Sequence, residues 1–199
     1  MKRLTLLRHA KSGWDDPVKR DFDRPLNARG EKAATLMGSY ARDQDMTFDL
    51  LVASPAVRVV ETLDHFLDSY GKTIETLWDR RIYLASAAAL IDVLHAMPDS
   101  ADTLMMAGHN PGLEDLILDL VPETEGDALR AEVEAKFPTA SLATIVLDVA
   151  HWKDVESGMG RLVAFTRPAI WMRPWGRRRI ETGPRIILAY CAKHNSRSP

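Results

Sequence analysis

Two histidines and two arginines of this chain follow predicted strands near the point where each strand ends. Arg8 and His9 come directly after a short apolar strand, and Arg58 lies one turn into the helix that follows a second strand. His109 comes directly after a third apolar strand. Because ligands of open α/β sheets bind outside the carboxyl ends of the strands, we expect these four side chains to converge on one site.

The chemistry that suits this set is transfer of a phosphoryl group. Guanidinium groups bind phosphoryl oxygens through charge-assisted and partly bidentate hydrogen bonds. One imidazole can attack phosphorus while the other stabilises charge on the phosphoryl oxygens. The sequence has no P-loop, no glycine-rich nucleotide fingerprint and no Cys/His cluster with zinc spacing, so no metal or cofactor is expected. Taken alone, Arg8-His9 fits equally well a surface ion pair followed by a loop cap.

The elements that must position these residues alternate along the chain. Strands are predicted over residues 4–7, 48–53, 73–78, 102–107, 141–149 and 161–166. Helices are predicted over 28–42, from Pro55 to about Gly71, and over 84–97, 113–121 and part of 123–136, the last a short helix or a lid. Short buried strands that alternate with helices predict an α/β fold with a mainly parallel central sheet covered on both faces, a three-layer α/β/α sandwich.

Length and composition favour one globular enzyme domain. The chain has 199 residues, of which 46% are hydrophobic and 27% charged. Its apolar runs are far shorter than the ~18 residues that a membrane span needs, and the four residues between Arg3 and Arg8, three of them leucine, are too few for the core of a signal peptide. We therefore expect a cytoplasmic protein that does not associate with membranes.

The charge of the chain is unevenly distributed. Residues 167–199 hold eight Lys or Arg and one acidic residue, whereas residues 1–166 hold 18 basic and 27 acidic residues. We expect a catalytic domain over 1–168 and a basic C-terminal extension over 169–199 that is not an independent domain. The extension is predicted to lie on the acidic domain or on a second subunit as a homo-oligomer contact. It has no RNA-binding signature, so a nucleic-acid partner is not expected.

Four blocks of the sequence resemble the histidine phosphatase superfamily in order and spacing. They are LTLLRHAKSGW, RPLNARG at 24–30, SPAVRVVET at 54–62 and AGHNPGLE at 107–114. The pattern is most similar to the short bacterial phosphohistidine phosphatases, which implies a phosphoglycerate-mutase-like fold. The resemblance also implies that His9 is the phosphorylated nucleophile and that Arg8, Arg58 and His109 complete the phosphate pocket.

Two departures from that pattern bear on the substrate. Phosphoglycerate mutases of the superfamily have Gly where this chain has Ala10. Mutases and many ester phosphatases also have a glutamate as proton donor beyond the third strand, where the nearest carboxylate here is Asp79. Ester oxygens need a proton to leave, whereas the imidazole of phosphohistidine is a better leaving group. The missing acid therefore favours phosphohistidine in proteins over small phosphate esters, for which Asp79 would be the general acid. A non-catalytic phosphate- or phosphoprotein-binding module is the alternative of another class.

Several further polar residues are candidates near the site. Ser12, Asp15 and Asn110 are predicted to bind substrate, although each could equally stabilise its own loop. Arg24 is expected to structure the turn at Pro25 rather than to contact substrate. His9 must be neutral to attack phosphorus, and Arg8 and Arg58 are expected to lower its pKa, whereas a bound phosphate dianion is expected to help keep His109 protonated. The rate of substrate capture should therefore rise with pH and fall again when His109 loses its proton.

Overall fold

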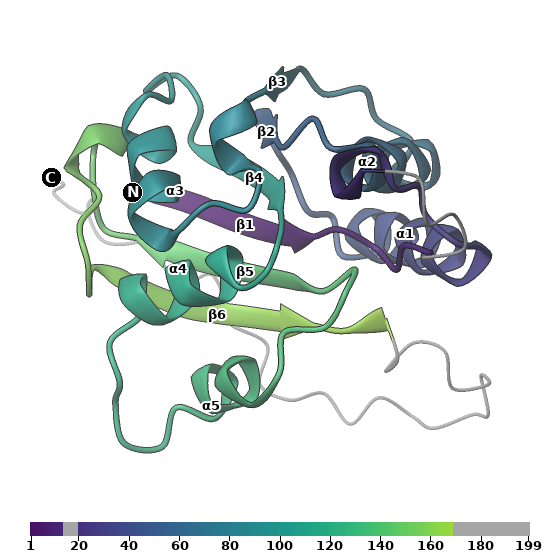
Figure 1. The fold of residues 1–199 in the computed structure, drawn as a ribbon. Coiled ribbons are helices and arrows are strands. Elements are labelled where there is room, and N and C mark those ends of the chain that lie inside the picture. The colour runs from purple at the N-terminus through teal and green to yellow at the C-terminus, as the bar shows by residue number, and fades with distance from the viewer. Residues whose placement is uncertain (14–19, 169–199) are drawn as a thin grey trace, which may run out of the picture.

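One six-stranded sheet forms the centre of the molecule (Figure 1). The structure is a computed structural model that describes residues 1–13 and 20–168. Its strands are β1 (Lys2–Arg8), β2 (Leu50–Ala53), β3 (Thr76–Trp78), β4 (Thr103–Gly108), β5 (Leu142–Leu147) and β6 (Gly160–Thr166). Their spatial order is β3-β2-β4-β1-β5-β6. β1 to β4 are parallel, and β5 is antiparallel to both β1 and β6, so β5 alone runs against the others. The predicted mainly parallel sheet is confirmed.

Helices cover both faces of this sheet, as the sequence predicts. They are α1 (Ala28–Asp43), α2 (Val57–Tyr70), α3 (Ala87–His95), α4 (Gly112–Leu120) and α5 (Ala128–Ala135). Leu4 and Leu6 of β1 pack in one apolar cluster with α3, α4 and α5, whereas Leu7 packs in the second cluster with α1 and α2. Because successive side chains of a strand point to opposite faces, the two clusters are the two sides of a three-layer α/β/α sandwich.

The ends of the helices show where local sequence rules hold. α1 begins as expected after Asn27, whose side chain accepts a hydrogen bond from the amide of Gly30. α2 ends before Gly71, which adopts a φ of 75° that a residue without Cβ accommodates easily. The predicted start of α2 at Pro55 is wrong, because the helix begins at Val57 and the preceding Ala56 makes no side-chain cap.

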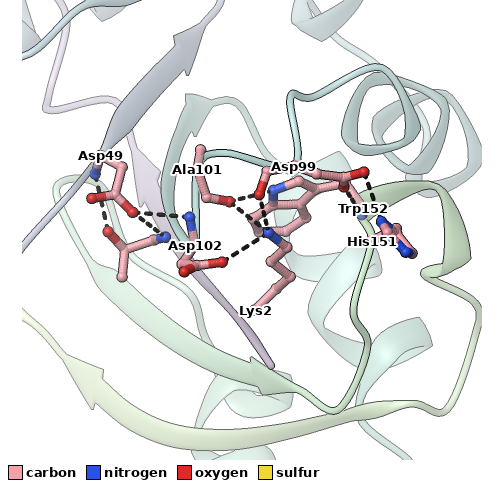
Figure 2. A network of polar contacts seen from close by, with 8 residues as sticks. Lys2, Asp49, Asp99, Ala101, Asp102, His151 and Trp152 are labelled. Atoms are coloured by element: carbon pink, nitrogen blue, oxygen red, sulfur yellow. Dashed lines mark hydrogen bonds and ion pairs between the residues drawn. The ribbon is translucent and has the colours of Figure 1, made fainter.

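The amino end of β1, opposite the predicted site, is held by a buried lysine (Figure 2). Lys2 is only 2% exposed, and its Nζ donates to the carbonyl oxygens of Asp99 at 2.6 Å and Ala101 at 3.1 Å. It also contacts the carboxylate of Asp102 at 2.9 Å. The indole Nε1 of Trp152 donates to the same Ala101 oxygen at 2.7 Å. This network satisfies buried backbone acceptors and joins β1 to the turn before β4.

Within the described residues, no helix is long and apolar enough to cross a membrane. The division into a domain over 1–168 and an extension over 169–199 stays a prediction, because the extension lies outside the described residues.

Candidate active site

The carboxyl ends of β1, β2 and β4 bring the predicted residues to one edge of the sheet. Arg8 is the last residue of β1, and the amide of His9 donates to the carbonyl oxygen of Gly108 at 3.0 Å. His109 directly follows β4, and the amide of Ser54 after β2 donates to Ala107 at 3.1 Å. The rings of His9 and His109 lie 5.2 Å apart between centroids. The two histidines are therefore neighbours, as their positions after adjacent parallel strands predict.

His9 presents a free ring nitrogen. Its Nδ1 lies 2.7 Å from the carbonyl oxygen of Ala10, which can only accept a hydrogen bond. The proton therefore sits on Nδ1, and the lone pair of Nε2 is available. Burial is the largest cause that lowers the pKa of His9, the hydrogen bond to the Ala10 carbonyl opposes it, and the nearby charges of Arg58, Arg8 and Arg24 add to it, so that the pKa is about 4. His9 is consequently a neutral imidazole at pH 7.

His109 is held by a serine. Its Nε2 lies 2.9 Å from Oγ of Ser54, and that oxygen also receives the amide of Ala56 at 3.4 Å. We assign the hydroxyl hydrogen to the bond toward Nε2, which leaves the ring proton on Nδ1. This Nδ1 is buried and has no partner among the described residues. A buried donor without an acceptor is costly in a protein, so Nδ1 is suited to donate a hydrogen bond to an oxygen of a bound phosphoryl group.

Without a bound phosphate, His109 is not in the protonated state that is expected for it with phosphate bound. Burial lowers the pKa of His109 to about 3, and the charges of His9 and Arg58 act in the same direction. His109 is therefore also neutral at pH 7. It can still donate one hydrogen bond, but it brings no positive charge of its own to the empty site.

Arg58 is buried and bound by an acidic residue that the sequence analysis did not identify. Its Nη1 donates to the backbone oxygen of Asp21 at 2.6 Å, and its Nη2 contacts Oδ2 of Asp21 at 3.0 Å. Oδ2 also accepts from the hydroxyl of Tyr83 at 2.8 Å, and Oδ1 accepts from Arg24 at 2.8 Å. Burial alone would raise the pKa of Asp21, but hydrogen bonds from Tyr83 and Arg24 and the charge of Arg58 lower it to about 2.

Asp21 and Tyr83 lie in segments without apolar periodicity, which is why pattern alone could not place them. Asp21 opens the short 3₁₀ helix η1 (Asp21–Asp23), and Tyr83 follows the 3₁₀ helix η2 (Arg80–Ile82). The ring of Tyr83 packs edge-on against His109, with centroids 5.3 Å apart. The one signal in the sequence was the charged run before Arg24, and it does not reveal which partners its carboxylates have.

Arg8 and the loop after His9 are braced by backbone atoms. The Nη1 of Arg8 donates to the carbonyl oxygen of Phe137 at 2.5 Å, and its buried Nε has no partner among the described residues. The amide of Ala10 donates to Oγ1 of Thr62 at 2.9 Å, which ties the loop to α2. Thr62 is a further residue of the site that the sequence analysis did not single out.

The three residues predicted to bind substrate have different surroundings. Ser12 accepts a hydrogen bond from Arg24 at 2.8 Å, and Arg24 also donates to the oxygen of Gly13, so both stabilise the loop, as expected for Arg24. Asn110 donates to the carboxylate of Glu114 at 2.7 Å and keeps a buried Oδ1 without a partner in the described part of the chain. Asp15 lies outside the described residues.

Asp79, the candidate general acid for ester substrates, forms an ion pair with Arg81. The guanidinium of Arg81 contacts both carboxylate oxygens, at 2.7 Å for the shortest pair, and the amide of Arg81 donates to Oδ1 at 2.8 Å. The hydrogen bonds from Arg81 are the main reason that the pKa of Asp79 is lowered. An ionised carboxylate turned toward Arg81 is a poor proton donor at neutral pH.

No group of three His, Cys, Asp or Glu side chains within 1–13 and 20–168 is arranged to hold a metal ion. The side chains that do converge are two neutral imidazoles and the buried or half-buried guanidiniums of Arg8 and Arg58. One imidazole has an available Nε2, and the other has a buried donor without a partner. This arrangement has the groups that phosphoryl transfer through a histidine nucleophile requires.

Comparison with known proteins identifies the family. Residues 4–80 match the family "Histidine phosphatase superfamily (branch 1)". An uncharacterized protein of Mycobacterium tuberculosis is 37% identical over 164 residues, which are 81% of this chain and 99% of the relative. An uncharacterized protein of Mycobacterium leprae is 31% identical over 167 residues, again 81% of this chain and 99% of the relative. The chain belongs to the histidine phosphatase superfamily, whose members are typically phosphatases.

Solved structures agree with this assignment. The putative phosphohistidine phosphatase SixA of Agrobacterium tumefaciens is 29% identical and superposes with a TM-score of 0.70, over 84% of this chain and 98% of that one. A protein histidine phosphatase SixA complexed with tungstate has a TM-score of 0.69 at 19% identity, which supports the fold alone, over 85% of this chain and 99% of that one. The phosphoglycerate-mutase-like fold and the likeness to the SixA group are thus confirmed.

Proposed function

We propose that this protein hydrolyses phosphohistidine in proteins through a covalent phosphohistidine intermediate at His9, without a metal or cofactor. Three features support the proposal: the neutral His9 with a lone pair on Nε2, the guanidiniums around it, and the similarity to the SixA group. Hydrolysis of a phosphorylated small molecule by the same residues is the competing possibility within the superfamily.

The state of the nearby carboxylates is the observation that favours phosphohistidine. Asp21 and Asp79 are both held ionised by arginines, with the pKa of Asp21 lowered to about 2 and that of Asp79 also lowered. Neither can supply a proton to a leaving alkoxide near neutral pH. In phosphohistidine the leaving group is an imidazole, which needs far less help from an acid than an alkoxide does. The site therefore suits a P–N bond better than a P–O bond.

The proposed reaction has two displacements at phosphorus. Nε2 of His9 attacks phosphorus and a new P–N bond forms, while the bond to the substrate ring breaks. That ring carries a proton on its other nitrogen, so it keeps the electron pair of the broken bond and leaves as a neutral imidazole. Arg8, Arg58 and Nδ1 of His109 bind the phosphoryl oxygens and stabilise the charge that develops on them. Water then attacks the phosphorus of phospho-His9, which releases inorganic phosphate and restores the free imidazole.

A substrate panel tests the proposal. We expect kcat/KM for a phosphohistidine peptide to exceed that for sugar phosphates and nucleotides by at least about a hundredfold, since a missing general acid costs roughly 10²–10⁴ in rate. The activity should persist in the presence of a chelator. Labelled substrate should leave an acid-labile, alkali-stable label on the wild type and none on the His9→Ala variant.

The outcomes that would contradict the proposal are equally definite. Faster turnover of small phosphate esters would reassign the protein to that substrate class. Full activity of His9→Ala would remove His9 from the mechanism. A binding module, in contrast, would take up phosphorylated compounds without multiple turnovers of any member of the panel.

A further inference from the structure

A cavity lined by positive charge lies directly beside the phosphate pocket. Its volume is about 470 Å³, within the range of small ligand sites. Five basic residues line it, namely Arg8, Lys11, Arg29, Lys136 and Arg167, and no acidic or aromatic side chain of the described residues does. Arg8 therefore belongs both to this cavity and to the set of charges that act on His9.

The walls of this basic cavity are fixed to the backbone of the catalytic loop. The amide of Asn27, which caps α1, donates to the carbonyl oxygen of Lys11 at 3.0 Å. A Cβ added to Gly30 would lie 2.1 Å from that same oxygen, so α1 meets the loop at a distance that only glycine allows. On the other side, the amide of Ala140 donates to the carbonyl oxygens of Arg8 and His9 at 3.0 and 3.1 Å. The cavity is therefore held in place relative to His9.

Most of the charge in the basic cavity is uncompensated. Arg167 contacts the carboxylate of Glu132 at 2.8 Å. Lys11, Arg29 and Lys136 are exposed, and none of their charged side-chain groups has a hydrogen bond or ion pair with another described residue. Arg29 also lies in the first turn of α1, where the helix dipole makes a cation unfavourable. Helix stability thus does not explain Arg29, whereas attraction of an anion does.

We infer that the basic cavity is a subsite for carboxylate side chains that flank the phosphohistidine of a protein substrate. This inference rests on the proposed function. The lack of aromatic side chains among the described lining residues provides no stacking surface for a nucleobase, so simple anionic groups fit it best. Its exposed cations face solvent, as contact with a protein surface requires. Arg8 connects the two sites, so acidic groups in the cavity and the phosphoryl group would be bound together.

Two phosphohistidine peptides of equal length test the subsite, one with Asp and Glu flanking the phosphohistidine and one with Asn and Gln. We expect the wild type to prefer the acidic peptide in kcat/KM by about fivefold to tenfold at low salt, as two or three exposed ion pairs allow. Screening should reduce the preference at high salt. Arg29→Gln with Lys136→Gln should abolish it and leave the rate on the neutral peptide unchanged.

Lys153→Gln is the matched control. Lys153 is exposed in the 3₁₀ helix η3 (Trp152–Asp154), next to Trp152 of the Lys2 network at the far end of β1. This variant removes one surface charge and should keep the full preference for the acidic peptide. Equal rates on both peptides in the wild type, or an unchanged preference in the double variant, would overturn the subsite.

Two further arms separate the possible failures. If neither phosphohistidine peptide is turned over, the proposed function fails. Calorimetric binding of the unphosphorylated acidic and neutral peptides then still tests the subsite, and equal affinities would overturn it. If the double variant loses only a preference for small bisphosphates over monophosphates, the cavity binds a second phosphate and the assignment to protein carboxylates is wrong.

Discussion

At the residue scale, one neighbouring oxygen decides which nitrogen of each histidine carries the proton. The carbonyl of Ala10 accepts a hydrogen bond from Nδ1 of His9, so the lone pair of Nε2 is free to attack phosphorus. The hydroxyl of Ser54 donates to Nε2 of His109, so Nδ1 of that ring carries the proton and is a donor. The four residue types could be predicted from the sequence because each follows a strand. The bond between Ser54 and His109 could not be predicted, since sequence rules describe the chain segment around Ser54 and not a ring that follows the distant strand β4.

The pH dependence of kcat/KM follows from the pKa values of the free enzyme. His9 must be neutral, and burial lowers its pKa to about 4, so the rate should rise with pH through that value and be complete by about pH 6. His109 is neutral above about 3, so it should cause no alkaline fall between pH 6 and 9. The measurement is kcat/KM from pH 3.5 to 9, corrected for ionisation of the substrate. A fall near pH 7 would show that a protonated His109 is required.

Ser54→Ala tests the position of the His109 proton. The variant removes the one hydrogen-bond partner that Nε2 of His109 has among the described residues, so the ring can place its proton on either nitrogen. We expect kcat to fall roughly fivefold, which corresponds to the loss of one hydrogen bond of about 1 kcal/mol, with little change in KM. Ring ¹⁵N chemical shifts of His109 should show a mixture of tautomers.

Ser141→Ala is the control for that change. Ser141 is also fully buried, but its hydroxyl has no hydrogen-bond partner in the described part of the protein. Its removal should leave kcat and the His109 shifts unaltered. Equal kinetics for the two serine variants would show that the bond from Ser54 does not set the state of His109.

At the element scale, the alternation of strands and helices could be predicted because burial on both faces of a parallel sheet gives short continuous apolar runs. The observed β2 and β4 each lie within two residues of their predicted limits. What could not be predicted are the contacts between elements that are distant in sequence. Asp21 reaches Arg58 and Tyr83 across 37 and 62 residues, through 3₁₀ turns that carry no periodic signal.

The close packing of α1 on α2 gives a prediction at this scale. A Cβ added to Gly38 would lie 2.1 Å from the carbonyl oxygen of Phe66 and 2.2 Å from Oγ of Ser69. Gly38→Ala should therefore lower the free energy of unfolding by about 1–3 kcal/mol, because overpacking outweighs the gain of about 1 kcal/mol in helix propensity. Chemical denaturation measures the change.

Ser39→Ala provides the comparison for Gly38→Ala. Ser39 is the next residue of α1 and is only half-buried, and its substitution should change the free energy of unfolding by no more than about 0.5 kcal/mol. A Gly38→Ala variant as stable as Ser39→Ala would mean that α1 and α2 can separate without cost.

At the scale of the whole molecule, the catalytic edge and the basic cavity belong to a region whose total charge is negative. Residues 1–166 hold 18 basic and 27 acidic residues, yet the residues that line the phosphate pocket and the cavity are mostly cationic. The negative remainder of the domain would repel acidic substrates from other faces, and the cavity would attract them to one edge. The proposed selectivity is thus a property of the charge distribution and not of the net charge of −2.

The basic extension over 169–199 gives the last prediction. The relative from Mycobacterium tuberculosis is matched over 99% of its length by 81% of this chain, so about a fifth of this chain lies outside that match. The residues that converge at the site all lie before residue 168, and Arg167 of the basic cavity is kept by truncation after Pro168. We therefore expect the truncated protein to retain kcat/KM on a small phosphoramidate within about twofold, since the contacts proposed for chemistry are all retained.

Truncation after Pro168 should instead lower stability, solubility or subunit association. The extension over 169–199 holds seven basic residues and one acidic residue, and we expect its charge to be attracted to the acidic domain of the same or a second subunit. Thermal unfolding and sedimentation at low and high salt measure these effects, and Arg177→Gln with Arg178→Gln and Arg179→Gln in the full chain should reproduce the charge-dependent part. If the truncated protein is equally stable and equally associated but no longer turns over small substrates, the extension belongs to the active site, and the division of roles between the two segments is wrong.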